Sequence, residues 1–285
     1  MEITVLAPAK INLTLDITGK RDDGYHTLTT IMQSISLADI VTISESNDNE
    51  INVITSTSSI PSGENNIAYA AAKSFYNYTN IIHNGINIYI QKNIPHEAGL
   101  GGGSADAAAV LVGLNHIHKS NLSLKQLFEI GVSVGADVPF CIAGGTKICE
   151  GIGEIITDTS CLENCYIVIS KGDLGISTKL AFKKIDDIGF KTISNTNFYN
   201  GTVQSIKENG YNRFEEFVVD DKIKFIKEKM IMMNAEYSAM TGSGSAVLGL
   251  FLNKQNAEEC TLFLKENGLF ACLCTPLKNG ASLIS

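Results

Sequence analysis

Four glycines in the stretch from residue 95 to residue 109 lie just before an alanine-rich segment, and they are the residues best placed for chemistry in this sequence. Because glycine has no Cβ atom, their backbone N–H groups can come close to a ligand. The amino end of a helix adds unpaired N–H groups and a partial positive charge, so the arrangement favours an anion, most naturally a phosphate. We expect a helix over residues 104 to 116, with Ser104 as its cap and Asp106 in its first turn. A tight turn without a ligand is the alternative interpretation of the glycines alone.

The common phosphate motifs do not match this stretch. A dinucleotide fingerprint that starts at Gly99 would need its final glycine where Ser104 stands. A P-loop needs Gly-Lys followed by Ser or Thr, but Gly19-Lys20 is followed by Arg21. The H-R-D and D-F-G triplets of protein kinases do not occur in the sequence. The glycines therefore indicate a phosphate loop of another type.

The charge of the chain limits its partners. The formal net charge is −8, and no basic stripe is present that could neutralise nucleic-acid phosphates, so we expect no nucleic-acid partner. Arginine occurs only at Arg21 and Arg213. A phosphorylated ligand would therefore be held by backbone N–H groups, lysines and Mg²⁺ rather than by a cluster of guanidinium groups.

The sequence lacks the usual signals of membrane and secreted proteins. No apolar run is long enough to span a bilayer, and the first residues lack the basic start and long apolar region of a signal peptide. We therefore expect a cytoplasmic protein without a membrane partner. The seven cysteines show no C-x-x-C spacing, so we expect reduced thiols and no metal site built from protein side chains.

The strands around the glycines determine where the glycines would lie. Residues 86 to 92 alternate apolar and polar, which predicts a strand that leads into the glycine run. Near the N-terminus, residues 3 to 6 and 11 to 17 predict two further strands. Four polar side chains share one face there, namely Lys10, Asn12, Thr14 and Asp16. We expect solvent to cover that face at Thr14 and Asp16.

Helices are predicted on both sides of the glycine run. Asn66 precedes a predicted helix that ends near residue 78. Another predicted helix is capped by Ser123 and stopped by Gly135, and Pro139 should prevent it from resuming. Asp137 would then lie on a rigid corner. Taken alone, its carboxylate also fits a turn former that binds the local backbone.

The second half of the sequence predicts a different lobe. From residue 166 onward the predicted order is strand, helices, strand, strand, helix, strand, which is typical of a ferredoxin-like α+β lobe once extra helices are left out. The central hairpin carries a second glycine-rich loop at residues 241 to 245. We expect one lobe over residues 1–156 and the other over residues 157–285.

Several segments resemble a known kinase superfamily. The stretch from residue 99 to residue 109 resembles the second motif of the galactokinase, homoserine kinase, mevalonate kinase and phosphomevalonate kinase (GHMP) superfamily, and residues 240–249 resemble its third motif. Three further segments resemble the branch whose substrate is a cytidine-diphosphate-linked methylerythritol, namely Pro8-Ala9-Lys10-Ile11-Asn12-Leu13, Gly24-Tyr25-His26 and Gly135-Ala136-Asp137-Val138-Pro139. The resemblance runs from residue 8 to about residue 252.

The resemblance implies an α+β, two-lobed GHMP-kinase fold. Its N-terminal lobe would be like the second domain of ribosomal protein S5, with a left-handed crossover that is otherwise rare, and its C-terminal lobe would be ferredoxin-like. The implied reaction transfers the γ-phosphate of ATP, with Mg²⁺, to the 2-hydroxyl of the cytidine-diphosphate-linked methylerythritol in non-mevalonate isoprenoid biosynthesis. The partner would be a small molecule, and the protein a monomer or a homodimer.

The resemblance also implies roles for individual residues. Asp137 would be the general base toward the hydroxyl, and Lys10 would stabilise that carboxylate and the transferred phosphoryl group. ATP would be bound by Pro95, Gly99, Leu100, Gly101, Gly102, Gly103, Ser104, Ala105 and Asn66, with the Ser104 hydroxyl near Mg²⁺. The substrate would be bound by Asn12, Tyr25, His26, Phe182, Gly242 and Gly244. In this set Tyr25 and Phe182 would stack on the cytosine and His26 would read its edge.

The sequence departs from the family pattern at three places without removing a reacting group. Ala105 stands where many members have serine, Ser245-Ala246 replaces a frequent Gly-Pro or Gly-Ala pair, and Arg213 follows Asn212 where aspartate is common.

Two alternative functions stay open. A homoserine or phosphomevalonate kinase would share both glycine loops but not the segments near residues 10 and 25. A sugar or nucleotide sensor without catalytic activity is the alternative from another class.

Overall fold

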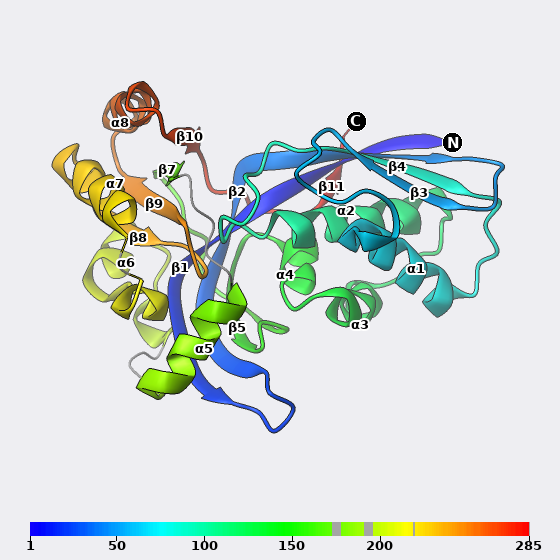
Figure 1. Cartoon of the computed structure of the whole chain (residues 1–285), viewed down its shortest axis with the longest axis horizontal. Helices are drawn as coiled ribbons and strands as arrows, with labels where there is room; N and C mark the ends of the chain where they lie inside the picture. Colours follow the sequence, from blue (N-terminus) through cyan, green and yellow to red (C-terminus); the bar gives the residue numbers. More distant parts are fainter. Residues whose placement is uncertain (173–177, 191–195, 219, 285) are drawn as a thin grey trace.

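The structure, a computed structural model, describes residues 1–172, 178–190, 196–218 and 220–284. Two separate sheets, one of seven strands and one of four, organise these residues. Figure 1 shows the sheets in different parts of the molecule, with helices packed against each and both chain termini at the larger sheet. The α+β class predicted from the sequence is confirmed.

The larger sheet is built on two long antiparallel strands, β1 (Glu2–Lys20) and β2 (His26–Glu45). The others are β3 (Ile51–Thr55), β4 (Ile86–Gln91), β5 (Thr146–Gly151), β6 (Ile155–Asp158) and β11 (Ser282–Leu283). They run in the order β11-β1-β2-β4-β3, while β5 pairs with β2 and β6 pairs with β5. The strand predicted before the glycine run is β4, and it pairs in parallel with β3.

The first strand is longer than the sequence predicted. Instead of separate strands over residues 3–6 and 11–17, β1 continues through Pro8. A register shift lies between Pro8 and Lys10, and such an irregularity accommodates proline, which has no N–H to donate to its neighbour strand. Lys10 and Asn12 therefore belong to a single continuous strand.

Four helices cover one face of the larger sheet, as Figure 1 shows: α1 (Ile67–Thr79), α2 (Gly102–Ile117), α3 (Leu124–Val134) and α4 (Val138–Ala143). The Asn66 side chain accepts a hydrogen bond from the N–H of Ala68 and caps α1. Ser123 and Gln126 form a reciprocal capping box at the start of α3. Both predicted helix starts are confirmed.

The helix after the glycine run begins earlier than predicted. It starts at Gly102 with Gly101 as its cap residue, and no side chain caps it. The predictions that Ser104 is the cap and that Asp106 lies in the first turn are therefore wrong. The reason is that Gly102 and Gly103 are themselves helical, which moves both residues further into the helix.

Pro139 starts a helix rather than preventing one. After α3 ends, α4 begins at Val138 with Pro139 in its first turn, where the missing N–H of proline is not needed for a helical hydrogen bond. Asp137 occupies the cap position of α4, yet its side chain makes no capping hydrogen bond. Its carboxylate is therefore not used as a local turn former.

The smaller sheet contains β7 (Tyr166–Lys171), β8 (Tyr237–Met240), β9 (Ala246–Phe251) and β10 (Phe270–Cys274). Its helices are α5 (Thr178–Ile188), α6 (Val203–Asn209), α7 (Asp221–Met232) and α8 (Lys254–Glu266). The strands are antiparallel in the order β10-β7-β9-β8. This arrangement matches the ferredoxin-like order predicted from the sequence.

The polar face of β1 is buried rather than solvated. Thr14 and Asp16 are 1% and 0% exposed, so the expectation that solvent covers this face is wrong. Thr14 Oγ1 accepts a hydrogen bond from the N–H of Ile31 at 3.2 Å, and the backbone N–H of Leu15 donates to the carbonyl of Tyr211 at 2.9 Å, so the second half of the chain lies along this part of β1. Within the described ranges, no helix combines the length and apolar character that crossing a bilayer requires.

Candidate active site

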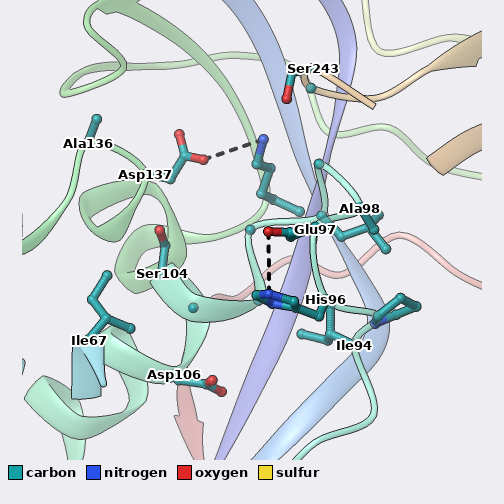
Figure 2. Close-up of a pocket in the computed structure, with 18 of the residues that line it drawn as sticks. Ile67, Ile94, His96, Glu97, Ala98, Ser104, Asp106, Ala136, Asp137 and Ser243 are labelled. Atoms are coloured by element: carbon teal, nitrogen blue, oxygen red, sulfur yellow. Dashed lines mark ion pairs between the residues drawn. The ribbon is translucent and has the colours of Figure 1, made fainter. Parts of the chain in front are cut away.

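A cavity of about 540 Å³ lies where distant segments of the chain meet. These segments include β1, the glycine run with the first turn of α2, the corner before α4, the loop at Gly242-Ser243, and parts of the chain near Asn66 and Phe182. Figure 2 shows Ser104, Asp137 and Ser243 around this cavity. Its lining includes Lys10, Asn12, Asn66, Pro95, Gly99, Leu100, Gly101, Gly102, Gly103, Ser104, Asp137, Phe182 and Gly242. The fold thus brings together most of the residues that the sequence singled out.

Four of the singled-out residues lie outside this lining. Ala105 is fully buried in α2, and Tyr25 is 60% exposed. Gly244 belongs to the loop that packs on the glycine run, since a Cβ at Gly99 would lie 3.3 Å from its carbonyl oxygen. The ring of His26 packs against α5 of the second half of the chain. Contacts of these four residues with a ligand remain predictions.

The backbone of the glycine run leaves no room for side chains at two positions. Gly99 and Gly101 have φ angles of 76° and 68°, in the left-handed region that favours glycine. A Cβ at Gly99 would lie 2.2 Å from the carbonyl oxygen of Thr241, and one at Gly101 would lie 2.8 Å from Cγ of Lys10. The first glycine lets the two glycine-rich loops touch, and the second leaves space for the Lys10 side chain.

Lys10 and Asp137 form an ion pair at the cavity, marked by a dashed line in Figure 2. The distance from Lys10 Nζ to Asp137 Oδ2 is 3.4 Å, and the two side chains are 6% and 29% exposed. The backbone N–H of Lys10 donates to the carbonyl of Leu100 at 3.0 Å, which ties β1 to the glycine run. A partly exposed carboxylate can take a proton from a bound hydroxyl, while the buried ammonium stabilises negative charge beside it.

Asn12 connects the ion pair to the second glycine-rich loop. Its Oδ1 accepts hydrogen bonds from Lys10 Nζ at 2.9 Å and from the N–H of Gly242 at 3.1 Å. Its Nδ2 donates to Thr30 Oγ1 at 2.8 Å. Asn12 is only 3% exposed, so the structure gives it a part in holding Lys10 in place in addition to the substrate contact that the family resemblance implies.

A second buried cluster at the glycine run was not anticipated from the sequence. Lys92 Nζ contacts Asp106 Oδ2 at 2.5 Å and also pairs with the carboxylate of Asp39. Burial raises the pKa of the Asp106 carboxyl well above its usual range, although the Lys92 ammonium opposes this. A Cβ at Gly102 would lie 3.5 Å from Lys92 Nζ. The cluster therefore places an ammonium group against the first residue of α2.

Comparisons with known proteins agree with this arrangement. The family described as GHMP kinases N terminal domain matches residues 66–145. A 4-diphosphocytidyl-2-C-methyl-D-erythritol kinase of Caldicellulosiruptor saccharolyticus is 43% identical over 271 residues, which cover 91% of this chain and 93% of that protein. A kinase of the same name from Clostridium tetani is 44% identical over 266 residues, with coverage of 90% and 93%.

Solved structures share the whole fold. A crystal structure of 4-(cytidine 5′-diphospho)-2C-methyl-D-erythritol kinase has a TM-score of 0.79 at 29% identity and covers 96% of this chain and 99% of its own. A homoserine kinase from Cytophaga hutchinsonii has a TM-score of 0.78 with coverage of 99% and 97%, but its 17% identity shows a common fold alone. With relatives above 40% identity over nine-tenths of its length, the chain belongs to the 4-diphosphocytidyl-2-C-methyl-D-erythritol kinase family of the GHMP kinases.

Proposed function

We propose that this chain transfers the γ-phosphate of ATP to the 2-hydroxyl of 4-diphosphocytidyl-2-C-methyl-D-erythritol in non-mevalonate isoprenoid biosynthesis. The products are the 2-phosphate and ADP. The observation that carries the proposal is the Lys10–Asp137 ion pair beside a helix-initiating glycine run, in a chain 43% identical to a kinase of that name.

The phosphates of ATP would lie on backbone N–H groups from Gly99 to Ser104, since the N–H of Ala105 donates to the carbonyl of Gly101 at 2.9 Å. Because α2 begins at Gly102, the positive end of its dipole faces an anion at the glycine run. Lys10 lines the same cavity and adds an ammonium group, while Lys92 also lines it but is paired with the carboxylates of Asp39 and Asp106. This combination of backbone donors and lysines replaces the guanidinium groups that the chain lacks there.

The phosphoryl acceptor would lie next to Asp137. Its carboxylate would accept the proton of the 2-hydroxyl as the oxygen bonds to the γ-phosphorus, and general base catalysis of this kind contributes typically about 10²–10⁴-fold. The Lys10 ammonium would stabilise the carboxylate and the charge on the transferred group. Phosphoryl transfer has a loose transition state, so catalysis depends mainly on positioning. Asn12 and the carbonyl of Leu100 hold Lys10 in position for this step.

Mg²⁺ is the expected companion of ATP in this reaction. This ion commonly keeps several waters and binds substrate phosphates with only one or two protein groups. Ser104 fits such a site because its hydroxyl lies at the cavity in the first turn of α2. In the part of the chain that the structure describes, no group of three His, Cys, Asp or Glu side chains is gathered as a metal site. When bound, Mg²⁺ would neutralise phosphate charge, and Ser104 would hold it.

The test is a coupled ADP-release assay with three alcohols at matched concentrations: the cytidine-linked methylerythritol, homoserine and phosphomevalonate. We expect the cytidine-linked alcohol to release ADP, and ³¹P NMR to show a new phosphate monoester on that product. Release that is as efficient with either of the other alcohols would assign the chain to another kinase reaction. Binding of the cytidine-linked alcohol without any ADP release would favour a sensor.

A further inference from the structure

The second glycine-rich loop is held by Asn212, a buried residue that does not line the cavity. The Asn212 side chain belongs to a residue that is 5% exposed. Its Nδ2 donates to the carbonyl of Met240 at 2.8 Å and to the carbonyl of Gly242 at 2.8 Å. These two carbonyls belong to the residues on either side of Thr241. One amide group therefore bridges the turn at which the loop begins.

The oxygen of the same amide fixes its orientation. Asn212 Oδ1 accepts a hydrogen bond from the N–H of Phe214 at 2.9 Å and caps the 3₁₀ helix Arg213–Glu216. Because the oxygen must face this N–H, the Nδ2 group must face the two carbonyls. Arg213, which departs from the family pattern, donates from Nη2 to the carbonyl of Gly189 at 3.0 Å. The arginine thus faces the end of α5, and the contact with the loop carbonyls falls to Asn212.

The loop in turn holds the side chain that fixes Lys10. The N–H of Gly242 donates to Asn12 Oδ1 at 3.1 Å, and Thr241 Oγ1 accepts from the N–H of Asn12 at 2.9 Å. Asn12 Oδ1 also accepts from Lys10 Nζ at 2.9 Å. Gly242 therefore bonds to Asn212 through its carbonyl and to Asn12 through its N–H. A rotation of Gly242 would change both contacts.

We infer that Asn212 is a positioning residue for the proposed phosphoryl transfer. It keeps Gly242 in the orientation in which its N–H holds Asn12, and Asn12 keeps the Lys10 ammonium beside Asp137. The inference rests on the proposed function. Without the amide, the carbonyls of Met240 and Gly242 lose this donor, and glycine then has many other backbone conformations available to it. The loop would no longer hold Asn12 in one place.

A role as helix cap alone has different consequences. If Asn212 only capped the 3₁₀ helix, serine could replace it, because serine caps about as well as asparagine. A positioning role requires the amide, since the serine hydroxyl has one proton and cannot donate to both carbonyls. Asn212→Ser therefore separates the two roles, whereas Asn212→Ala removes both. Asn253→Ala is the matched control, because Asn253 is an exposed asparagine that caps α8.

The first measurement is steady-state kinetics with the cytidine-linked alcohol, expressed per folded protein. We expect Asn212→Ala and Asn212→Ser each to lower kcat by about 10²-fold, the scale of a displacement of about 1 Å at a reacting group. The KM for each substrate should stay within about threefold of the parent value. Asn253→Ala should keep the parent kinetics. A parent-like kcat in Asn212→Ser, or a rise in KM without a loss of kcat, would overturn the inference.

A double-mutant cycle tests whether Asn212 acts through Asn12. If it does, Asn12→Ala already releases Lys10, and the addition of Asn212→Ala should lower kcat by no more than about threefold further. Independent contributions would instead multiply. A double variant that loses the full effect of both single changes would therefore contradict the inference.

A third measurement does not depend on activity. Labelling with carbonyl-¹³C threonine and ¹⁵N glycine selects Thr-Gly pairs in NMR spectra, and the sequence has such pairs only at Thr18-Gly19 and Thr241-Gly242. Amide hydrogen exchange at Gly242 should be at least about tenfold faster in Asn212→Ala than in the parent, with Gly19 as the internal reference for global unfolding. Unchanged exchange at Gly242 would overturn the inference. A parent that phosphorylates none of the three alcohols would instead contradict the proposed function, while the exchange result would still show whether Asn212 holds the loop.

Discussion

The two ends of the cavity hold their polar side chains in different ways. At the catalytic end, Lys10 and Asn12 are 5% and 3% exposed, and their partners include backbone groups of both glycine-rich loops. Next to Phe182, the predicted base-binding residues are held by side chains alone. The His26 side chain is 8% exposed, but its hydrogen-bond partner is the Asp186 carboxylate, which is 31% exposed, and Tyr25 is 60% exposed.

This difference predicts how each end responds to change. In a buried network of low dielectric constant, hydrogen bonds are strong, and a partner left unpaired is costly. Near the surface, water and salt screen the same kinds of contact, so their loss costs less. We therefore expect changes at the catalytic end to abolish turnover and changes at the base-binding wall to alter the choice of substrate.

The largest effect is expected for Asp137→Asn. The amide cannot take the hydroxyl proton, so turnover should fall by about 10²–10⁴-fold, while ATP affinity stays nearly unchanged because the glycine run is intact. Steady-state kinetics and equilibrium ATP titration check this. Asp158→Asn, at a side chain that is 91% exposed, is the control. Turnover within a few fold of the parent would rule out the base role.

The next effect is expected for Gly101→Ala. Alanine at residue 101 would have to adopt a φ of 68°, and its Cβ would lie 2.8 Å from Cγ of Lys10. The Lys10 side chain must therefore move. A displacement of this kind can lower kcat by about 10²-fold. Gly268→Ala is the matched control, because Gly268 has a φ of 77° with open space around its Cβ position. Equal losses in both variants would contradict a specific link between Gly101 and Lys10.

His26→Ala tests the predicted base-binding wall, which consists of Tyr25, His26 and Phe182. Removal of the imidazole should leave turnover of the cytidine-linked substrate measurable but abolish a preference over uridine that we expect to be on the order of 10². The measurement is kcat/KM for both substrates. An unchanged preference in His26→Ala would show that another group reads the base.

The smallest effect is expected for Tyr25→Ala. Stacking contributes affinity whichever base is bound, so KM should rise about tenfold for cytidine-linked and uridine-linked substrate alike, with kcat preserved. Tyr89→Ala, at a tyrosine that is 46% exposed on β4, is the control. A selective loss for cytidine would instead assign base reading to Tyr25.

Local sequence patterns predicted much of this site. The glycine run, the Asn66 cap, and the order of strands and helices along the second half of the chain follow from signals within a few residues. The cluster of Lys92 with Asp39 and Asp106 does not, because its members are 53 and 14 positions apart. His26 and Asp186 are separated by 160 positions. No local pattern could pair these side chains.

The sequence by itself determined the anion-binding character of the glycine run, since it depends on absent side chains and on a helix that follows directly. Tertiary structure decided which polar residues became buried. Thr14 and Asp16 alternate like residues of a solvated strand face, yet they are 1% and 0% exposed in the tertiary structure, where the second half of the chain bonds to the neighbouring Leu15 of β1. The same packing gives Lys10 its surroundings, in which the desolvated ammonium interacts with Asp137 more strongly than it would in water.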